Sequence, residues 1–271
     1  MLKRIVRVGI LLLLTLVSVA QKDKSCPDPI MPEVTARGRA LFEYDEAAWH
    51  ASDALQASHP ATNLLGRYIA HKSDSGWVVA FGHLNEQRDK FIFAYEVTQG
   101  GTPKDFIVRK LDPPREDTSF YFAAAKAIEI ALHDFQSQAQ QRPYNVAVLP
   151  APSDQLYVYV LPALTKPGIY PLGGDVRYLI TGDGGIIVEK RQLHRSILDI
   201  DQKNSIPKGA TLAGGTHTHV LSDVPEDTDV FHVLTRQPPQ PEFIGTPSRR
   251  FYQINTDGII RELTIQTQSP R

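Results

Sequence analysis

Short β-rich runs separated by turn residues make up most of this chain, and only three stretches have the spacing of a helix. The three helical stretches are residues 39–55, 117–138 and 226–235. Helices that alternate with groups of hairpin strands are typical of an α+β fold. The 271 residues are 42% hydrophobic and 22% charged, which is an ordinary globular composition. We therefore predict an α+β protein.

The first folded unit is expected at residues 38–113, as a helix followed by an antiparallel meander. The helix covers residues 39–55, and Trp49 lies beside its apolar face, where we expect it to pack under the sheet. Residues 91–97 alternate between apolar and polar side chains, which predicts one buried and one solvated face. Residues 112–114, Asp-Pro-Pro, are expected to end the unit. The strands are predicted at residues 65–71, 77–83, 91–97 and 106–111.

The second unit is expected at residues 114–271 and has a more complex order of elements. Asp117 or Thr118 is the predicted cap of a long helix, after which two hairpins follow. A strand, a helix with an acidic first turn and three closing strands complete the unit. The strands are predicted at residues 145–150, 156–161, 176–181, 186–193, 211–220, 242–246, 250–255 and 259–265.

Residues 1–20 have the layout of a secretory signal peptide. A basic start is followed by an apolar run at residues 10–17 and by Ser18 and Ala20 at the positions before a cleavage site. The apolar run is short for a membrane span, so an uncleaved anchor is the alternative. We predict cleavage near Ala20, a secreted or periplasmic location, and no membrane span in the mature chain.

Residues 21–37 are mostly polar and contain three prolines, which predicts a flexible tether. Cys26 is the only cysteine, so no internal disulfide can form. Of the 29 Lys and Arg residues three lie in the predicted signal peptide, which leaves 26 against 30 Asp and Glu. The chain has no excess of positive charge, so we expect no nucleic-acid partner.

A pair of histidines two positions apart is the main candidate for chemistry. His217 and His219 lie in a predicted strand, where side chains alternate, so both imidazoles point to the same face. Asp229, at the start of the following helix, could supply a carboxylate. Two imidazoles and one carboxylate form the ligand set of an open zinc site. The alternative is a pair of hydrogen-bonded strand histidines next to acids that favour a helix N-terminus.

The order of elements and these motifs resemble the JAB/MPN (JAMM) metalloprotease family, over about residues 117–263. Residues 225–229, Pro-Glu-Asp-Thr-Asp, resemble the Pro-Ser-Glu-Thr-Asp of its bacterial members. The resemblance implies a JAB/MPN-like α+β domain with His217, His219 and Asp229 as ligands of Zn²⁺. It also implies a metallohydrolase that cleaves amide or isopeptide bonds.

Two positions depart from the family pattern. Asn145 stands where the family has the glutamate that acts as general base, and asparagine cannot take a proton from a zinc-bound water. Glu226 stands where the family has a serine. Glu226, Asp227 or Glu189 could replace the missing base, and we take Glu226 as the candidate catalytic residue.

Three functions follow from these patterns. The first is an exported binding or scaffolding module with a zinc-binding JAB/MPN-like domain, whose partner we expect to be a protein or a peptide. The second is a secreted zinc-dependent amide or isopeptide hydrolase. The third is a structural envelope protein without a metal.

Overall fold

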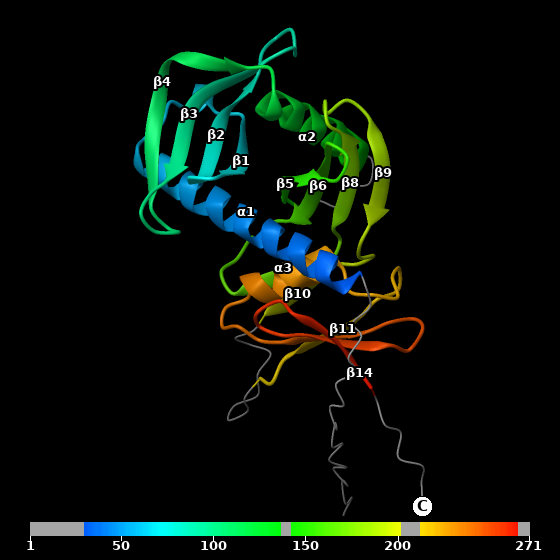
Figure 1. Cartoon of the computed structure of the whole chain (residues 1–271). Helices are drawn as coiled ribbons and strands as arrows, with labels where there is room; N and C mark the ends of the chain where they lie inside the picture. Colours follow the sequence, from blue (N-terminus) through cyan, green and yellow to red (C-terminus); the bar gives the residue numbers. More distant parts are fainter. Residues whose placement is uncertain (1–29, 137–141, 202–211, 265–271) are drawn as a thin grey trace, which may run out of the picture.

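The computed structural model describes residues 30–136, 142–201 and 212–264 (Figure 1). Three α-helices and fourteen strands lie in these ranges, so the predicted α+β class is confirmed. The predicted signal peptide, Cys26 and residues 21–29 of the predicted tether lie outside the described residues. No helix in the described ranges is long and apolar enough to cross a membrane.

The longest helix, α1 (Met31–Ala57), begins well before the predicted residue 39. The tether prediction for residues 21–37 is therefore wrong at residues 31–37. Pro32 lies in the first helical turn, where the missing N–H costs no hydrogen bond. Met31 and Val34 are buried and pack against helix α3, described below, and the sheet beside it. Tertiary burial therefore extends the helix into a segment whose composition indicated a linker.

The first sheet is the predicted antiparallel meander after the helix. Its strands are β1 (Arg67–Ser73), β2 (Gly76–Leu84), β3 (Phe91–Gln99) and β4 (Phe106–Asp117). The short 3₁₀ helix η1 (Thr62–Leu64) connects α1 to it.

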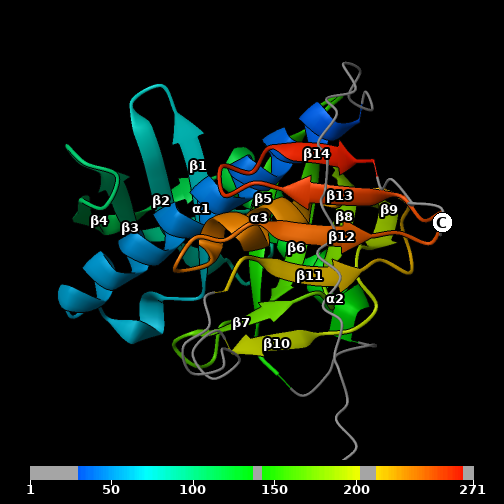
Figure 2. The ribbon, with the colours of Figure 1, turned by 90° about the horizontal axis from the view of Figure 1, so that it is seen from below.

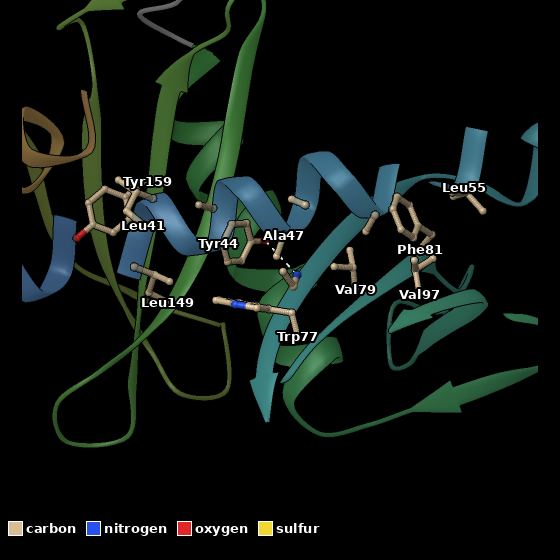
Figure 3. Close-up of a cluster of buried hydrophobic side chains, with 14 of the residues drawn as sticks. Leu41, Tyr44, Ala47, Leu55, Trp77, Val79, Phe81, Val97, Leu149 and Tyr159 are labelled. Carbon is tan, nitrogen blue, oxygen red and sulfur yellow. Dashed lines mark hydrogen bonds between the residues drawn. The ribbon is translucent and has the colours of Figure 1, made fainter. Parts of the chain in front are cut away.

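A buried cluster joins α1 to this meander (Figure 3). Leu41 and Tyr44 of the helix pack with Trp77 and Val79 of β2. The hydroxyl of Tyr44 accepts a hydrogen bond of 3.3 Å from the backbone N–H of Ala70 in β1. The helix therefore covers one face of the sheet through both apolar contact and a polar contact to the strand backbone.

The predicted end of the fourth strand at residue 111 and the predicted position of Trp49 are wrong. Strand β4 continues through residues 112–114 to Asp117, and a register shift between Phe93 and Tyr95 of β3 accommodates the extension. Trp49 is 56% exposed and stacks on His50 with ring centroids 5.0 Å apart, so it does not lie under the sheet.

Helix α2 (Phe120–Gln136) lies between the meander and a second four-stranded sheet (Figure 1). Its N-terminus is capped by Asp117, whose carboxylate accepts hydrogen bonds from the backbone of Ser119 and Phe122. The second sheet has the order β5-β6-β8-β9 and consists of the two predicted hairpins. Its strands are β5 (Tyr144–Ala151), β6 (Gln155–Pro162), β8 (Val176–Thr181) and β9 (Ile187–Gln192).

The buried clusters contain residues from both sides of the boundary predicted at residue 113. Ile69 and Phe93 of the meander belong to the same cluster as Ile128 of α2 and Val158 of β6. The division into units at residues 38–113 and 114–271 stays a prediction.

The last part of the chain forms a third layer below the N-terminal half of α1 (Figure 1). Helix α3 (Asp227–Thr235) packs against α1, and the sheet β11-β12-β13-β14 covers its other side. Strand β11 pairs in parallel with β12, and the remaining pairs are antiparallel. The strands are β11 (Gly215–Thr218), β12 (Glu242–Gly245), β13 (Phe251–Ile254) and β14 (Ile260–Leu263).

A separate two-stranded pair, β7 (Ile169–Leu172) with β10 (Leu198–Asp201), lies next to β11 in Figure 2. Neither strand was predicted. Both are four residues long, and Ile169–Leu172 contains a proline, which is rare within a sheet.

Candidate metal centre

Four side chains from three segments converge in this third layer. His217 lies in β11, His219 follows one residue after the strand, and Asp229 lies in the first turn of α3. His194 comes from the segment that follows β9. One donor atom from each of the four lies within 4.8 Å of the others. The three predicted ligands are therefore brought together, and His194 joins them.

The imidazoles all present Nε2 to the carboxylate of Asp229. Oδ1 of Asp229 lies 3.0 Å from Nε2 of His194 and 3.1 Å from Nε2 of His217. Oδ2 lies 3.1 Å from Nε2 of His219. These separations are close to those between neighbouring donors around one ion with bonds of about 2.0–2.1 Å to nitrogen.

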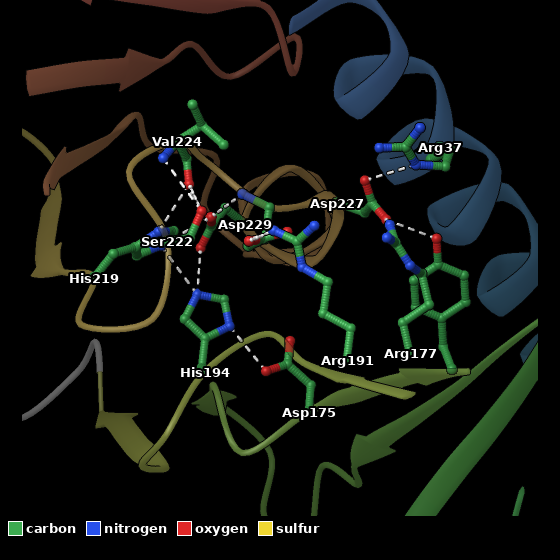
Figure 4. Close-up of polar contacts among 12 residues, drawn as sticks. Arg37, Asp175, Arg177, Arg191, His194, His219, Ser222, Val224, Asp227 and Asp229 are labelled. Carbon is green, nitrogen blue, oxygen red and sulfur yellow. Dashed lines mark hydrogen bonds and ion pairs between the residues drawn. The ribbon is translucent and has the colours of Figure 1, made fainter. Parts of the chain in front are cut away.

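Each histidine is held through its second ring nitrogen. Nδ1 of His194 lies 2.8 Å from a carboxylate oxygen of Asp175, and Nδ1 of His217 lies 2.8 Å from a carboxylate oxygen of Glu242. Nδ1 of His219 lies 3.0 Å from the carbonyl oxygen of Val224. An acceptor at Nδ1 favours the tautomer whose Nε2 carries the lone pair, which is the arrangement found behind metal-bound histidines. Figure 4 shows His194 beside Asp175 and His219 beside Val224.

The buried charges around the centre also favour a cation. Asp229, Asp175 and Glu242 are at most 2% exposed and carry three negative charges. Arg236, 1% exposed, donates a hydrogen bond of 2.7 Å to Glu242 and supplies one positive charge. With neutral histidines a net of two negative charges remains, which a divalent cation would balance. Buried charge without such balance is strongly unfavourable.

The pKa values show how the same residues behave without an ion. Burial lowers the pKa of His194, but the carboxylates of Asp175 and Asp229 outweigh it and raise the pKa well above its ordinary value. For His217 burial is likewise outweighed by Asp229 and Glu242, and the pKa rises to about 9. Burial raises the pKa of Asp229, and the three histidines reverse this and hold the pKa well below its usual range.

Two buried atoms at the centre have no hydrogen-bond partner. Nε2 of His217 and Oδ1 of Asp229 are 3.1 Å apart, and with neutral histidines protonated at Nδ1 neither atom has a hydrogen to donate to the other. Buried polar atoms are almost always satisfied, so such a pair requires an explanation. A shared ion would satisfy both.

Local structure explains why these residues can meet. Gly215 lies two residues before His217, and a Cβ atom there would lie 2.0 Å from Oε2 of Glu242 and 2.6 Å from a guanidinium nitrogen of Arg236. Glycine therefore leaves the space in which the Glu242–Arg236 pair supports His217.

The candidate catalytic residue Glu226 has a structural position at the N-cap of α3. Its side chain accepts a hydrogen bond from the backbone of Asp229 in a capping box. A guanidinium nitrogen of Arg191 donates to the same carboxylate at 2.5 Å. Glu226 is 3% exposed, and burial raises its pKa. It does not belong to the group of converging donors, and its catalytic role stays a prediction.

The other candidates for a general base, and Asn145, also lie outside the candidate centre. Asp227 is fully buried and is bound by Arg37 at 2.9 Å, by Arg177 at 2.5 Å and by the hydroxyl of Tyr159 at 2.8 Å. Glu189 is exposed on β9, and Asn145 is exposed on β5. None of these three residues belongs to the converging donor group.

A cleft of about 240 Å³ reaches the centre from outside. His194, His217 and His219 line it, but Asp229 does not. The centre therefore contacts the cleft through its imidazoles, while the carboxylate is enclosed by protein.

His194 is the member of the candidate centre that sequence reasoning missed. It lies 23 residues before His217. Sequence motifs for metal sites have ligands at short, fixed spacings, and this distance fits none of them. Its position just after a predicted hairpin strand was the only signal in the sequence. No family model, curated protein or solved structure matches this chain. The resemblance to the JAB/MPN family therefore stays a prediction.

Proposed function

We propose that this chain is an exported zinc-binding module whose centre consists of His194, His217, His219 and Asp229. The observation that supports it is the convergence of four buried donors, each histidine held by an outer acceptor. The role is binding of a protein or peptide partner rather than hydrolysis. Export is inferred from the N-terminal sequence alone.

The donor set favours zinc among common metals. Imidazole nitrogen with one carboxylate oxygen suits Zn²⁺, whereas Ca²⁺ and Mg²⁺ prefer sites made of oxygen. Zinc in proteins is usually four-coordinate. Four protein ligands therefore complete the coordination, and the open position that a catalytic zinc uses for water is taken by His194.

Metal analysis of the purified protein tests this function. We expect about one zinc per chain in the parent and loss of zinc in His194→Ala and in His217→Ala. His83→Ala is the control, because His83 in β2 belongs to no group of converging donors in the described part of the chain. A zinc-free parent would contradict the proposal and leave the structural envelope protein. Full zinc content in His194→Ala would contradict the four-ligand centre.

A zinc-dependent amide hydrolase is the second candidate, and the cleft that reaches three imidazoles favours it. Zinc can expand to five ligands during a reaction. In this case the zinc-loaded protein would cleave peptide amides, and Glu226→Gln would lose the activity while it keeps its zinc. Absence of cleavage over a peptide panel would leave the binding module.

A further inference from the structure

The cleft beside the metal centre lies between two sheet elements. Thr218 of β11 lines one side, and Leu172 of β7 and Leu198 of β10 line the other. In Figure 2 the β7–β10 pair follows directly after β11. The cleft volume of about 240 Å³ is smaller than that of sites for drug-sized ligands, about 300–1,000 Å³. It can hold the end of a chain rather than a long segment.

Large apolar side chains gather at this cleft. Leu198, Val220 and Leu221 line it and are 50%, 59% and 49% exposed. Leu172 and Leu193 line it as well and are buried. Apolar surface that gathers around a concave site indicates a binding surface. This lining is suited to a ligand with an apolar side chain.

Strand β11 provides an unpaired edge beside the cleft. Among the described residues it pairs with β12 alone, and it is the first strand of its sheet. An extended peptide can add to such an edge through backbone hydrogen bonds. A main chain is therefore a better match to this side of the cleft than a ligand without one.

Arg195 is a cation that lines the cleft. Arg195 is exposed and makes no hydrogen bond or ion pair with any residue of the described ranges. It directly follows His194 in the chain, so its backbone lies beside the candidate centre. Arginine binds carboxylates through paired hydrogen bonds.

We propose that the cleft binds the C-terminal end of a peptide with an apolar last residue. The last side chain packs among Leu172, Leu198 and Val220, the main chain follows the edge of β11, and the terminal carboxylate binds Arg195. The proposal deepens the proposed function, because it names the partner class of the module. Arg195 is not a metal ligand, so the two can fail separately.

Peptide binding to the zinc-loaded full chain tests this proposal by calorimetry. The probes are N-acetyl-Ala-Ala-Leu, its C-terminal amide and N-acetyl-Ala-Ala-Ser. We expect the leucine acid to bind about tenfold or more tightly than either of the others. Arg195→Gln should bind the acid and the amide with equal affinity. Leu198→Ser should lower the affinity for the leucine acid toward that for the serine peptide. Arg261→Gln, exposed on β14 at the other edge of the sheet, is the control.

Zinc content is measured in every sample and separates the two proposals. If the parent lacks zinc, the proposed function fails. The preference for the acid over the amide then still shows whether the cleft binds a terminal carboxylate. Equal binding of acid and amide by the parent, or no binding at millimolar peptide, would overturn the peptide proposal. A preference that survives in Arg195→Gln would also overturn it, because the carboxylate would then be bound elsewhere.

Discussion

The carboxylate of Asp229 accepts a hydrogen bond of 2.7 Å from the backbone N–H of Glu226 while it faces three histidines. One side chain therefore completes the N-terminus of α3 and contributes to the candidate metal centre. The sequence offered these two roles as alternatives, and the structure combines them. The helix start holds Asp229 in place, so the geometry of the centre depends on α3.

The outer acceptors of the histidines should control metal affinity. Asp175→Asn and Glu242→Gln keep the shape of each side chain but remove the negative charge that faces Nδ1 of His194 or His217. We expect zinc affinity to fall about 10–100-fold in each variant. Competition with a zinc-binding dye measures this affinity. Asp199→Asn, an exposed residue of β10 paired with Arg142, serves as control and should keep the parent affinity.

Zinc binding should also require the empty space beside the Cα atom of Gly215, because that space lets Glu242 support His217. Gly215→Ala places a methyl group against Glu242 and Arg236, so the side chains that support His217 must shift. We expect weaker zinc binding and a lower thermal midpoint. Gly101→Ala is the matched control, because a Cβ atom there meets nothing within 4 Å. Equal behaviour of the two variants would show that the close contact at Gly215 has no consequence.

The contact between Arg37 of α1 and Asp227 of α3 should stabilise the junction of the two helices. Asp227 is fully buried, and Arg37→Met removes one of its charged partners. We expect the free energy of unfolding to fall by about 1–3 kcal/mol, which denaturant titration measures. Lys72→Met, which breaks the exposed pair with Glu43, should cost at most about 1 kcal/mol. A smaller loss in Arg37→Met than in Lys72→Met would contradict the expectation.

Asp45 in α1 should make stability depend on pH. Burial, with a contribution from Glu46, raises its pKa to about 6. Between pH about 4 and 6 the folded protein therefore holds a proton that the unfolded chain has released, so stability falls as pH rises. Asp45→Asn stays neutral and should lose this dependence, with a free energy of unfolding about 1–2 kcal/mol above the parent at pH 7. Parallel stability curves for parent and variant from pH 4 to 7 would exclude a raised pKa at Asp45.

Much of the fold follows from local patterns in the sequence. The meander, both hairpins and the helix that starts after Glu226 are found near their predicted positions. Alternation, turn residues and capping residues are local signals, and these elements satisfy them. The start of α1 was missed because Met31 and Val34 are buried by contacts with residues from Val230 onward, far away in the sequence. Strands β7 and β10 were missed because four residues carry too little periodicity.

The candidate site could be predicted only in part. His217, His219 and Asp229 lie within thirteen consecutive residues, so a strand and a helix start are enough to relate them. His194 reaches the centre through a tertiary path, since its ring is directed by Asp175, whose backbone carbonyl also accepts a hydrogen bond from Leu193. No spacing rule describes that path. The charge balance with Glu242 and Arg236 likewise appears only after β12 has paired with β11.

The four donors come from separate parts of the chain, and this would affect how the protein responds to a protease. An ion bound by His194 and by the later donors closes a loop of the chain, in the manner of a cross-link. A single peptide-bond cleavage between His194 and His217 would then leave two fragments that stay associated in native buffer. A chelator would remove this link, so that only the packing of α3 and its sheet against α1 would still hold the fragments together.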